Sequence, residues 1–204
     1  MGIATLAVYF GTQYSNGQAR QRSIAVFEEA RASTQSFSFT PIAQPAPASI
    51  SRQSIDTSLW SPQRRAAYAK HASAQDLPEA ILRVPSIGLV VPVFEGTSEH
   101  NLSRGAARIE GTARFGESGN IGIAAHRDGF FRTLKDIEVG STLVLDGLNA
   151  RRVYQVAEIR IVEPSDISVL KPTGSASITL VTCYPFYFVG PAPRRFIVRG
   201  RATG

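Results

Sequence analysis

A series of short apolar runs after residue 80 limits the possible folds of this chain most strongly. The runs are rich in β-branched residues, and Gly, Pro and Asn residues separate them, as is typical of short strands joined by turns. We expect strands over Ile81–Val84, Leu89–Phe94, Ile121–Ala125, Thr142–Leu145, Val153–Val162, Ile178–Thr182 and Phe196–Val198. Asn101–Ile109 has apolar residues at helical spacing and predicts a short helix, and Phe130–Ile137 predicts a second short helix or turn. Many short strands with few helices favour a mostly-β, closed antiparallel barrel.

Three kinds of chemically distinctive residue, a cysteine, a histidine and a pair of arginines, stand where predicted strands begin or end. Cys183, the only cysteine, ends one apolar run, and His126 ends another. Arg194 and Arg195 open the last predicted strand. Loops at strand ends commonly carry functional groups. A cysteine, a histidine and an arginine in these places are typical of thiol-dependent acyl transfer.

Each of these residues, taken alone, has a simpler interpretation. A lone cysteine in a strand is most often an inert core residue, and a lone histidine is usually a hydrogen-bonded polar residue. Their occurrence together at strand ends favours the functional interpretation. His71, by contrast, lies among small and polar residues, and no neighbouring residue in the sequence suggests a catalytic partner. We therefore expect no catalytic role for it.

The residues around these positions resemble the sortases, the cysteine transpeptidases of bacterial cell surfaces. TLVTC at 179–183 is similar to the family's TLxTC signature, AHRD at 125–128 to its histidine strand, and RFIV at 195–198 to its arginine strand. AHRDGFFR and CYPFYFVG make the chain most similar to class D. The resemblance covers about Glu79 to Ala202. It implies the sortase fold, an eight-stranded antiparallel β-barrel with short helices.

The resemblance also implies a mechanism in which Cys183, His126 and Arg195 are catalytic. The thiolate is the nucleophilic form of a cysteine, and nearby positive charge favours it. His126 would protonate the departing amine and later accept a proton from the incoming one. Side chains of neighbouring strand residues point to opposite faces, so only one of Arg194 and Arg195 can face the thiol. We choose Arg195, because it directly precedes the Phe-Ile-Val run, as in the family.

Asp128 is a weaker candidate. It lies two residues after His126 and could orient the imidazole. An ion pair with Arg127 or Arg132 on the loop surface is the simpler interpretation, since sortases do not generally hold their histidine with a buried carboxylate.

In the sortases, the loop before the cysteine strand selects the substrate, and the resemblance implies the same here. Here that loop is Pro164–Thr173. Its apolar residues Ile167, Val169 and Leu170 could line a groove for the Leu and Pro of an LPxT-type sorting signal, or could simply pin the loop on the barrel. Thr182, next to the nucleophile, could contact the substrate backbone. The expected partners are the sorting-signal peptide of a secreted surface protein and an amine acceptor, either a cell-wall peptide or a pilin lysine.

The chain before residue 79 has a different composition, and we divide it into three segments. Residues 1–32 are expected to be a partial membrane anchor followed by a short helix, residues 33–58 a flexible linker rich in Pro, Ser and Gln, and residues 59–78 an N-terminal helix. Met1–Phe10 is apolar but shorter than the ~20 residues that span a bilayer. It is either a short amphipathic start or, as we favour, the outer end of an anchor. Residues 79–204 form the expected catalytic domain.

Composition excludes several other classes of protein. The hydrophobic fraction of 43% and the charged fraction of 19% are ordinary for a globular domain. The net charge of +6 arises from scattered basic residues, so nucleic-acid binding is not expected, although an anionic envelope is a possible partner. The three histidines are dispersed and there is one cysteine, so we expect no metal site, and no phosphate- or dinucleotide-binding spacing implies a cofactor.

Three functions therefore remain open. The first is a transpeptidase that cleaves a sorting signal through a thioester and transfers it to an amine. The second is a cysteine peptidase that hydrolyses the same thioester. The third is a non-catalytic surface or assembly barrel. The resemblance favours the first, at the cell membrane with the catalytic domain on its extracytoplasmic side.

Overall fold

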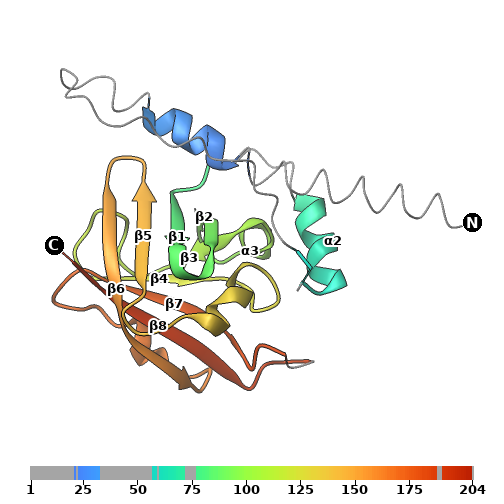
Figure 1. The fold of residues 1–204 in the computed structure, drawn as a ribbon. Helices are drawn as coiled ribbons and strands as arrows, with labels where there is room; N and C mark the ends of the chain where they lie inside the picture. Colours follow the sequence, from blue (N-terminus) through green and yellow to red (C-terminus); the bar gives the residue numbers. More distant parts are fainter. Residues whose placement is uncertain are drawn as a thin grey trace, which may run out of the picture.

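The computed structural model describes residues 21, 23–32, 57–58, 60–71, 77–187 and 190–203 (Figure 1). The predicted anchor over Met1–Phe10 and nearly all of the predicted linker lie outside the described residues, as does the side chain of His71. Within the described ranges, no helix combines the length and the apolar character needed to cross a membrane.

Eight strands close into a barrel, as predicted. They are β1 (Ala80–Val84), β2 (Leu89–Glu95), β3 (Ala106–Arg108), β4 (Asn120–Ala124), β5 (Thr142–Gly147), β6 (Arg151–Val162), β7 (Ser177–Tyr184) and β8 (Arg194–Ala202). Their order around the barrel is β1-β2-β3-β4-β7-β8-β6-β5 (Figure 1). The antiparallel prediction is right for most neighbours, but β2–β3 and β4–β7 run parallel. The parallel β4–β7 pair matters most, because it brings two carboxyl-terminal strand ends to the same mouth of the barrel.

The barrel interior forms the main apolar core. Strand alternation sends every second side chain inward, and the fully buried residues include Leu82, Ile123, Tyr154, Leu180 and Val198. A Cβ on Gly200 of β8 would lie 2.9 Å from Ile178 Cγ2, so the interior has no room for a larger residue there.

The prediction of a helix over Asn101–Ile109 is wrong in its second half. Helix α3 covers only Glu99–Arg104, and the chain then enters the short strand β3. Gly105 ends the helix in an extended conformation, and pairing of Ala106 with Val93 of β2 overrides the helical spacing of the apolar residues. The other short helices are η1 (Pro85–Ile87), η2 (Phe130–Asp136), which confirms the predicted turn, and η3 (Ile167–Leu170).

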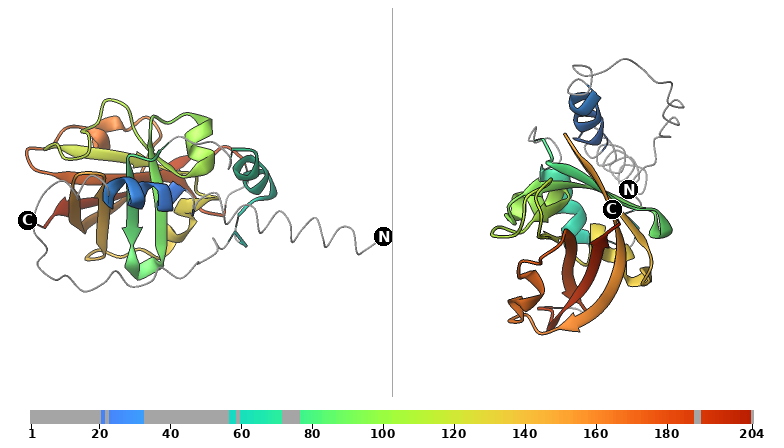
Figure 2. Two further views of the ribbon diagram at one scale, coloured as in Figure 1. Left: turned by 90° about the horizontal axis from the view of Figure 1, so that it is seen from above. Right: turned by 90° about the vertical axis from the view of Figure 1, so that its left-hand side faces the viewer.

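Two helices from the N-terminal part pack against the barrel. Helix α2 (Pro62–His71) lies beside α3, and Ser61 caps it by accepting a hydrogen bond from Arg64 N (Figures 1 and 2). Trp60 and Tyr68 are buried and meet the Phe130 ring edge to face, with centroids 4.8 Å and 5.9 Å away.

The helix of residues 23–32 docks elsewhere, over β1 and β5 (Figure 2). It buries Phe27 and forms ion pairs at 2.8 Å between Glu28 and Arg83 and at 3.3 Å between Arg31 and Asp146.

Candidate active site

The parallel pairing of β4 and β7 brings Cys183 and His126 together. Ala124 is opposite Val181 in the register, so each of the two candidate residues lies two positions beyond a paired residue. Two hydrogen bonds extend the alignment: Ala125 N donates to Val181 O over 3.3 Å, and Thr182 Oγ1 donates to Ala125 O over 2.8 Å. The strand that carries Cys183 and the segment that carries His126 are therefore held side by side.

Cys183 and His126 line one cleft of ≈ 750 Å³ at this mouth of the barrel. One wall comes from the start of α2, another from the loop between β7 and β8, and the remainder from the segment after β4. The full lining is Trp60, Ser61, Gln63, Arg64, His126, Arg127, Asp128, Arg132, Cys183, Phe186, Tyr187, Gly190, Pro191 and Ala192. The half-buried thiol thus opens onto a space large enough for part of a peptide.

Arg195 lies directly opposite Cys183 in the β7–β8 register, while Arg194 lies opposite Tyr184. Residues opposite each other on antiparallel strands point to the same face, so Arg195 shares the face of the thiol and Arg194 does not. Arg195 Nη1 donates to Ala192 O at 3.3 Å and to Arg194 O at 3.1 Å. Arg194 instead forms an exposed ion pair with Glu163 at 3.4 Å.

His126 is held in a polar but largely buried setting. Its Nε2 lies 3.3 Å from Glu99 Oε2, within ion-pair distance, but the two groups are not aligned for a hydrogen bond. Burial lowers the pKa of His126, and the Arg64 guanidinium lowers it further, against the opposing effect of the Glu99 and Asp128 carboxylates. The net shift of the pKa is downward, so the neutral imidazole is favoured.

Arg64 of α2 connects the groups around the histidine. It pairs with Glu99 at 3.0 Å and with Asp128 at 3.4 Å, and Ser61 Oγ donates to Asp128 at 2.7 Å. Burial raises the pKa of Asp128, but Ser61 and Arg64 outweigh it, and the pKa lies below its usual value. The ion-pair interpretation of Asp128 is thus correct in kind, but the partner is Arg64 rather than Arg127 or Arg132.

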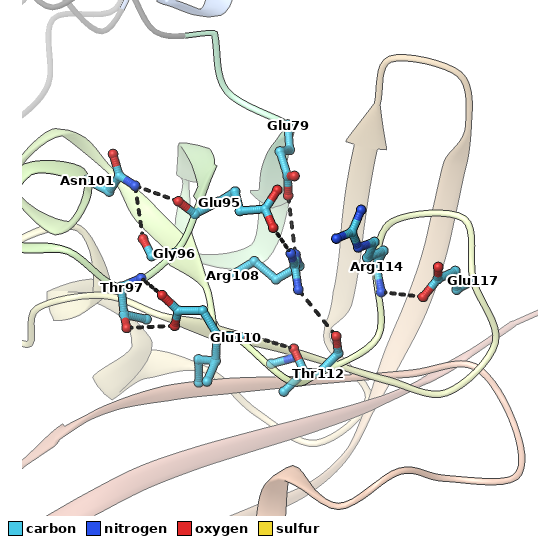
Figure 3. A network of polar contacts seen from close by, with 12 residues as sticks. Glu79, Glu95, Gly96, Thr97, Asn101, Arg108, Glu110, Thr112, Arg114 and Glu117 are labelled. Carbon is cyan, nitrogen blue, oxygen red and sulfur yellow. Dashed lines mark hydrogen bonds and ion pairs between the residues drawn. The ribbon is translucent and has the colours of Figure 1, made fainter.

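A polar network holds the chain between Glu95 and Asn101 (Figure 3). Asn101 Nδ2 donates to Glu95 O at 2.6 Å, and the Glu110 carboxylate accepts from Thr97 N at 3.1 Å and Thr97 Oγ1 at 3.0 Å. Arg108, nearly fully buried, pairs with Glu95 on the same side. These contacts fix the connection between β2 and α3, and with it the position from which Glu99 reaches His126.

The loop residues predicted to bind substrate lie outside this cleft. Val169 is buried with Val162 and Ile197 in a second apolar cluster on the outer face of the barrel, and Leu170 packs against that cluster. Ile167 is 73% exposed. For Val169 and Leu170 this placement favours the alternative in which they pin the loop on the barrel, while a role for Ile167 in substrate binding stays a prediction.

Two buried polar residues hold the same loop. Asn120 Nδ2 donates to Val169 O at 3.1 Å, and Arg199 Nη2 donates to the same carbonyl at 2.6 Å. Thr182 is also buried, and its hydroxyl donates a hydrogen bond to Ala125 O. This placement favours a role in aligning the two segments over contact with the substrate.

Sequence reasoning missed Arg64, Glu99 and Arg127 as neighbours of the site. The first two come from segments 62 and 27 positions before the histidine, and no local pattern marks them. Arg127 adjoins His126, and that adjacency was the one available signal. Among the described residues, no three His, Cys, Asp or Glu side chains gather closely enough to hold a metal ion.

Comparison with known proteins agrees with this geometry. The sortase domain family model matches residues 82–203. Sortase D of Bacillus subtilis (strain 168) is 33% identical over 122 residues, which are 59% of this chain and 62% of that protein. The chain thus spans less than two thirds of the length of this relative.

Solved structures give the same result. A Clostridium perfringens sortase D5 transpeptidase is 27% identical with a TM-score of 0.58, over 68% of this chain and 88% of that one. Sortase C1 of GBS Pilus Island 1 has a TM-score of 0.63 over 91% of this chain and 92% of its own, and at 24% identity it supports the fold alone. With the family model covering more than half of its length, the chain belongs to the sortase family of cysteine transpeptidases and resembles its class D members.

Proposed function

We propose that this protein is a transpeptidase that cleaves an LPxT-type sorting signal and transfers the acyl part to an amine at the cell envelope. The observation that carries the proposal is the meeting of Cys183 and His126 in one cleft, with Arg195 directly opposite the cysteine on the next strand. Family membership supplies the reaction class, and these residues supply the chemistry.

In the first half-reaction the Cys183 thiolate attacks the scissile carbonyl. The tetrahedral intermediate collapses when the C–N bond breaks, and the imidazolium of His126 gives its proton to the departing amine. A thioester between Cys183 and the signal remains. In the second half-reaction an incoming amine attacks the thioester, neutral His126 takes its proton, and the thiolate leaves.

Arg195 is proposed to stabilise the developing oxyanion or to hold the substrate backbone. Its guanidinium donates to Ala192 O and Arg194 O, and no acidic partner is among the contacts described for it. Arg195 itself does not line the cleft, but Ala192 does, and the strand register puts Arg195 on the same face as the thiol. Removal of such a donor typically lowers the rate by ~10²–10³-fold.

The lowered pKa of His126 limits the fraction of enzyme molecules in which this histidine is protonated and can act as an acid. Because burial and Arg64 disfavour the imidazolium, only a minor fraction of molecules carries the proton needed by the leaving amine near neutral pH. This arrangement suits the second half-reaction, in which the neutral imidazole acts as base.

The proposal includes the setting of the enzyme. The acyl donor would be the sorting signal of a secreted surface protein, and the acceptor would be a cell-wall peptide or a pilin lysine. The catalytic domain would lie on the extracytoplasmic side of the cell membrane. The same proposal includes a partial membrane anchor and short helix over residues 1–32, a flexible linker over residues 33–58, an N-terminal helix over residues 59–78 and a catalytic domain over residues 79–204.

Intact-mass spectrometry with an LPxT-type peptide library tests the mechanism. The wild type should gain the mass of the acyl fragment, and Cys183→Ala should gain none while retaining its circular dichroism spectrum. Peptide cleavage by the alanine variant would contradict the mechanism. Added amines distinguish transfer from hydrolysis, because only a transpeptidase forms the amide product, and a folded wild type that never forms an adduct would favour the non-catalytic barrel.

A further inference from the structure

The loop between β7 and β8 is held by arginines that come from the histidine side of the cleft. Arg127, the residue after His126, donates through Nη1 to Pro185 O at 3.0 Å and through Nη2 to Gly190 O at 2.9 Å. Arg132 in η2 donates through Nη1 to Phe186 O at 2.9 Å. Its guanidinium carbon also lies 4.2 Å from the centroid of the Tyr187 ring.

These contacts act on a wall of the cleft. Phe186, Tyr187, Gly190, Pro191 and Ala192 all line the space that contains Cys183. Backbone carbonyls of a loop can be satisfied by water, whereas here they are tied to two guanidinium groups that line the same cleft. The ring of Tyr187 is 67% exposed, so packing against the barrel does not fix its position.

The bidentate contact of Arg127 joins two points of the loop that are five residues apart. A planar guanidinium can donate to two carbonyls at once, while a lysine ammonium on its flexible stem cannot reproduce that fork. Arg127 therefore ties Pro185 and Gly190, on the two described sides of the loop, to the histidine segment.

We propose that Arg127 and Arg132 are positioning residues that hold the described parts of the β7–β8 loop, residues 185–187 and 190–192, as a substrate-binding wall of the cleft. This inference rests on the proposed function for its substrate, a peptide carrying the sorting signal. Neither residue is required to touch the reacting atoms, so their loss should weaken substrate binding more than it slows the chemical step.

The experiment compares Arg127→Lys and Arg132→Lys with a matched control, Arg152→Lys. Arg152 also donates to two loop carbonyls, Gly116 O and Glu117 O, but those lie in the β3–β4 connection and do not line the cleft. We expect KM for the cleaved peptide to rise by ~10-fold in Arg127→Lys, with kcat within ~3-fold of wild type, and both constants to stay unchanged in Arg152→Lys.

Hydrogen exchange provides a readout that does not depend on activity. Peptides covering residues 184–193 should exchange faster in Arg127→Lys and Arg132→Lys, while the β4 and β7 strands keep their protection. The double variant should show less than the sum of the single effects, because both arginines hold one loop.

Two results would overturn the inference. One is unchanged exchange of the loop in both variants, and the other is a loss of kcat at constant KM, which would place the arginines in the chemical step. A wild type that cleaves no peptide would refute the proposed function, yet the exchange measurement would still decide whether the arginines hold the loop.

Discussion

Arg195 and Arg194 are neighbours of the same type, and strand register separates their roles. Arg195→Lys keeps the charge but loses the planar fork, so we expect kcat/KM to fall by at least ~10²-fold. Arg194→Lys should change it by less than ~3-fold, because Arg194 lies opposite Tyr184 and pairs with exposed Glu163. Steady-state kinetics on both variants, with melting curves to confirm folding, tests this. Equal losses would mean that the register does not decide which arginine acts.

The protonation of His126 should respond in opposite directions to two nearby substitutions. Glu99→Gln removes a carboxylate that raises the pKa of His126, so the pKa should fall further. Arg64→Gln removes a charge that lowers it, so the pKa should rise. The imidazolium is present below the pKa and lost above it. The range of pH in which His126 is protonated therefore shrinks in the first variant and widens in the second.

NMR titration of the His126 imidazole in a Cys183→Ala background measures these shifts without interference from the thiol. The corresponding limb of the pH–rate profile should move in the same directions in variants that keep Cys183. Glu117→Gln is a suitable control, because Glu117 caps a turn by accepting from Arg114 N and is absent from the groups that act on His126. Shifts of the same sign in both test variants would contradict the electrostatic account.

At the scale of elements, helix α2 belongs to the N-terminal segment and also contributes side chains to the cleft of the candidate site. Trp60, Ser61, Gln63 and Arg64 line the cleft, and Trp60 and Tyr68 are buried against the barrel. The boundary at residue 79, predicted from composition, would remove all of them.

Two truncations test that boundary. A chain that begins at Ser58 should retain peptide cleavage. A chain that begins at Leu77 should be less stable by about 3 kcal/mol or more, since two buried aromatic side chains and their apolar partners lose their contacts. It should also have a raised KM. Thermal melting and peptide turnover measure both effects. Equal melting temperatures and equal KM values for the two chains would support residue 79 as the start of the functional domain.

At the scale of the whole molecule, the junction between α3 and β3 passes very close to β2. A Cβ on Gly105 would lie 2.3 Å from Pro92 O, a backbone atom of β2 that cannot move alone. We expect Gly105→Ala to destabilise the fold by ~1–3 kcal/mol, because the parallel β2–β3 pair would be forced apart. Gly174→Ala is the control, since its added Cβ meets no atom within 4 Å. Chemical denaturation compares the two, and similar midpoints would show that the junction can relax.

The sequence by itself determined the barrel and the residues at its mouth. Short β-branched runs with turn residues between them predict strands, because alternating side chains and local turn chemistry act over a few residues. Cys183, His126 and Arg195 could be named because each adjoins such a run within a recognisable motif. The predicted helix over Asn101–Ile109 was wrong in its second half, because pairing of β3 with β2 outweighed the local helical spacing.

Only the tertiary structure decided what surrounds those residues. The parallel β4–β7 pairing, the docking of α2 beside His126 and the hold of Arg127 on the β7–β8 loop join segments that are far apart in the chain. Contacts of this kind depend on how complete elements pack, and a hydrogen bond from Arg127 to Gly190 O leaves no local trace in sequence. The candidate catalytic residues can thus be predicted from short motifs, whereas the pKa of the histidine and the shape of the cleft arise from long-range packing.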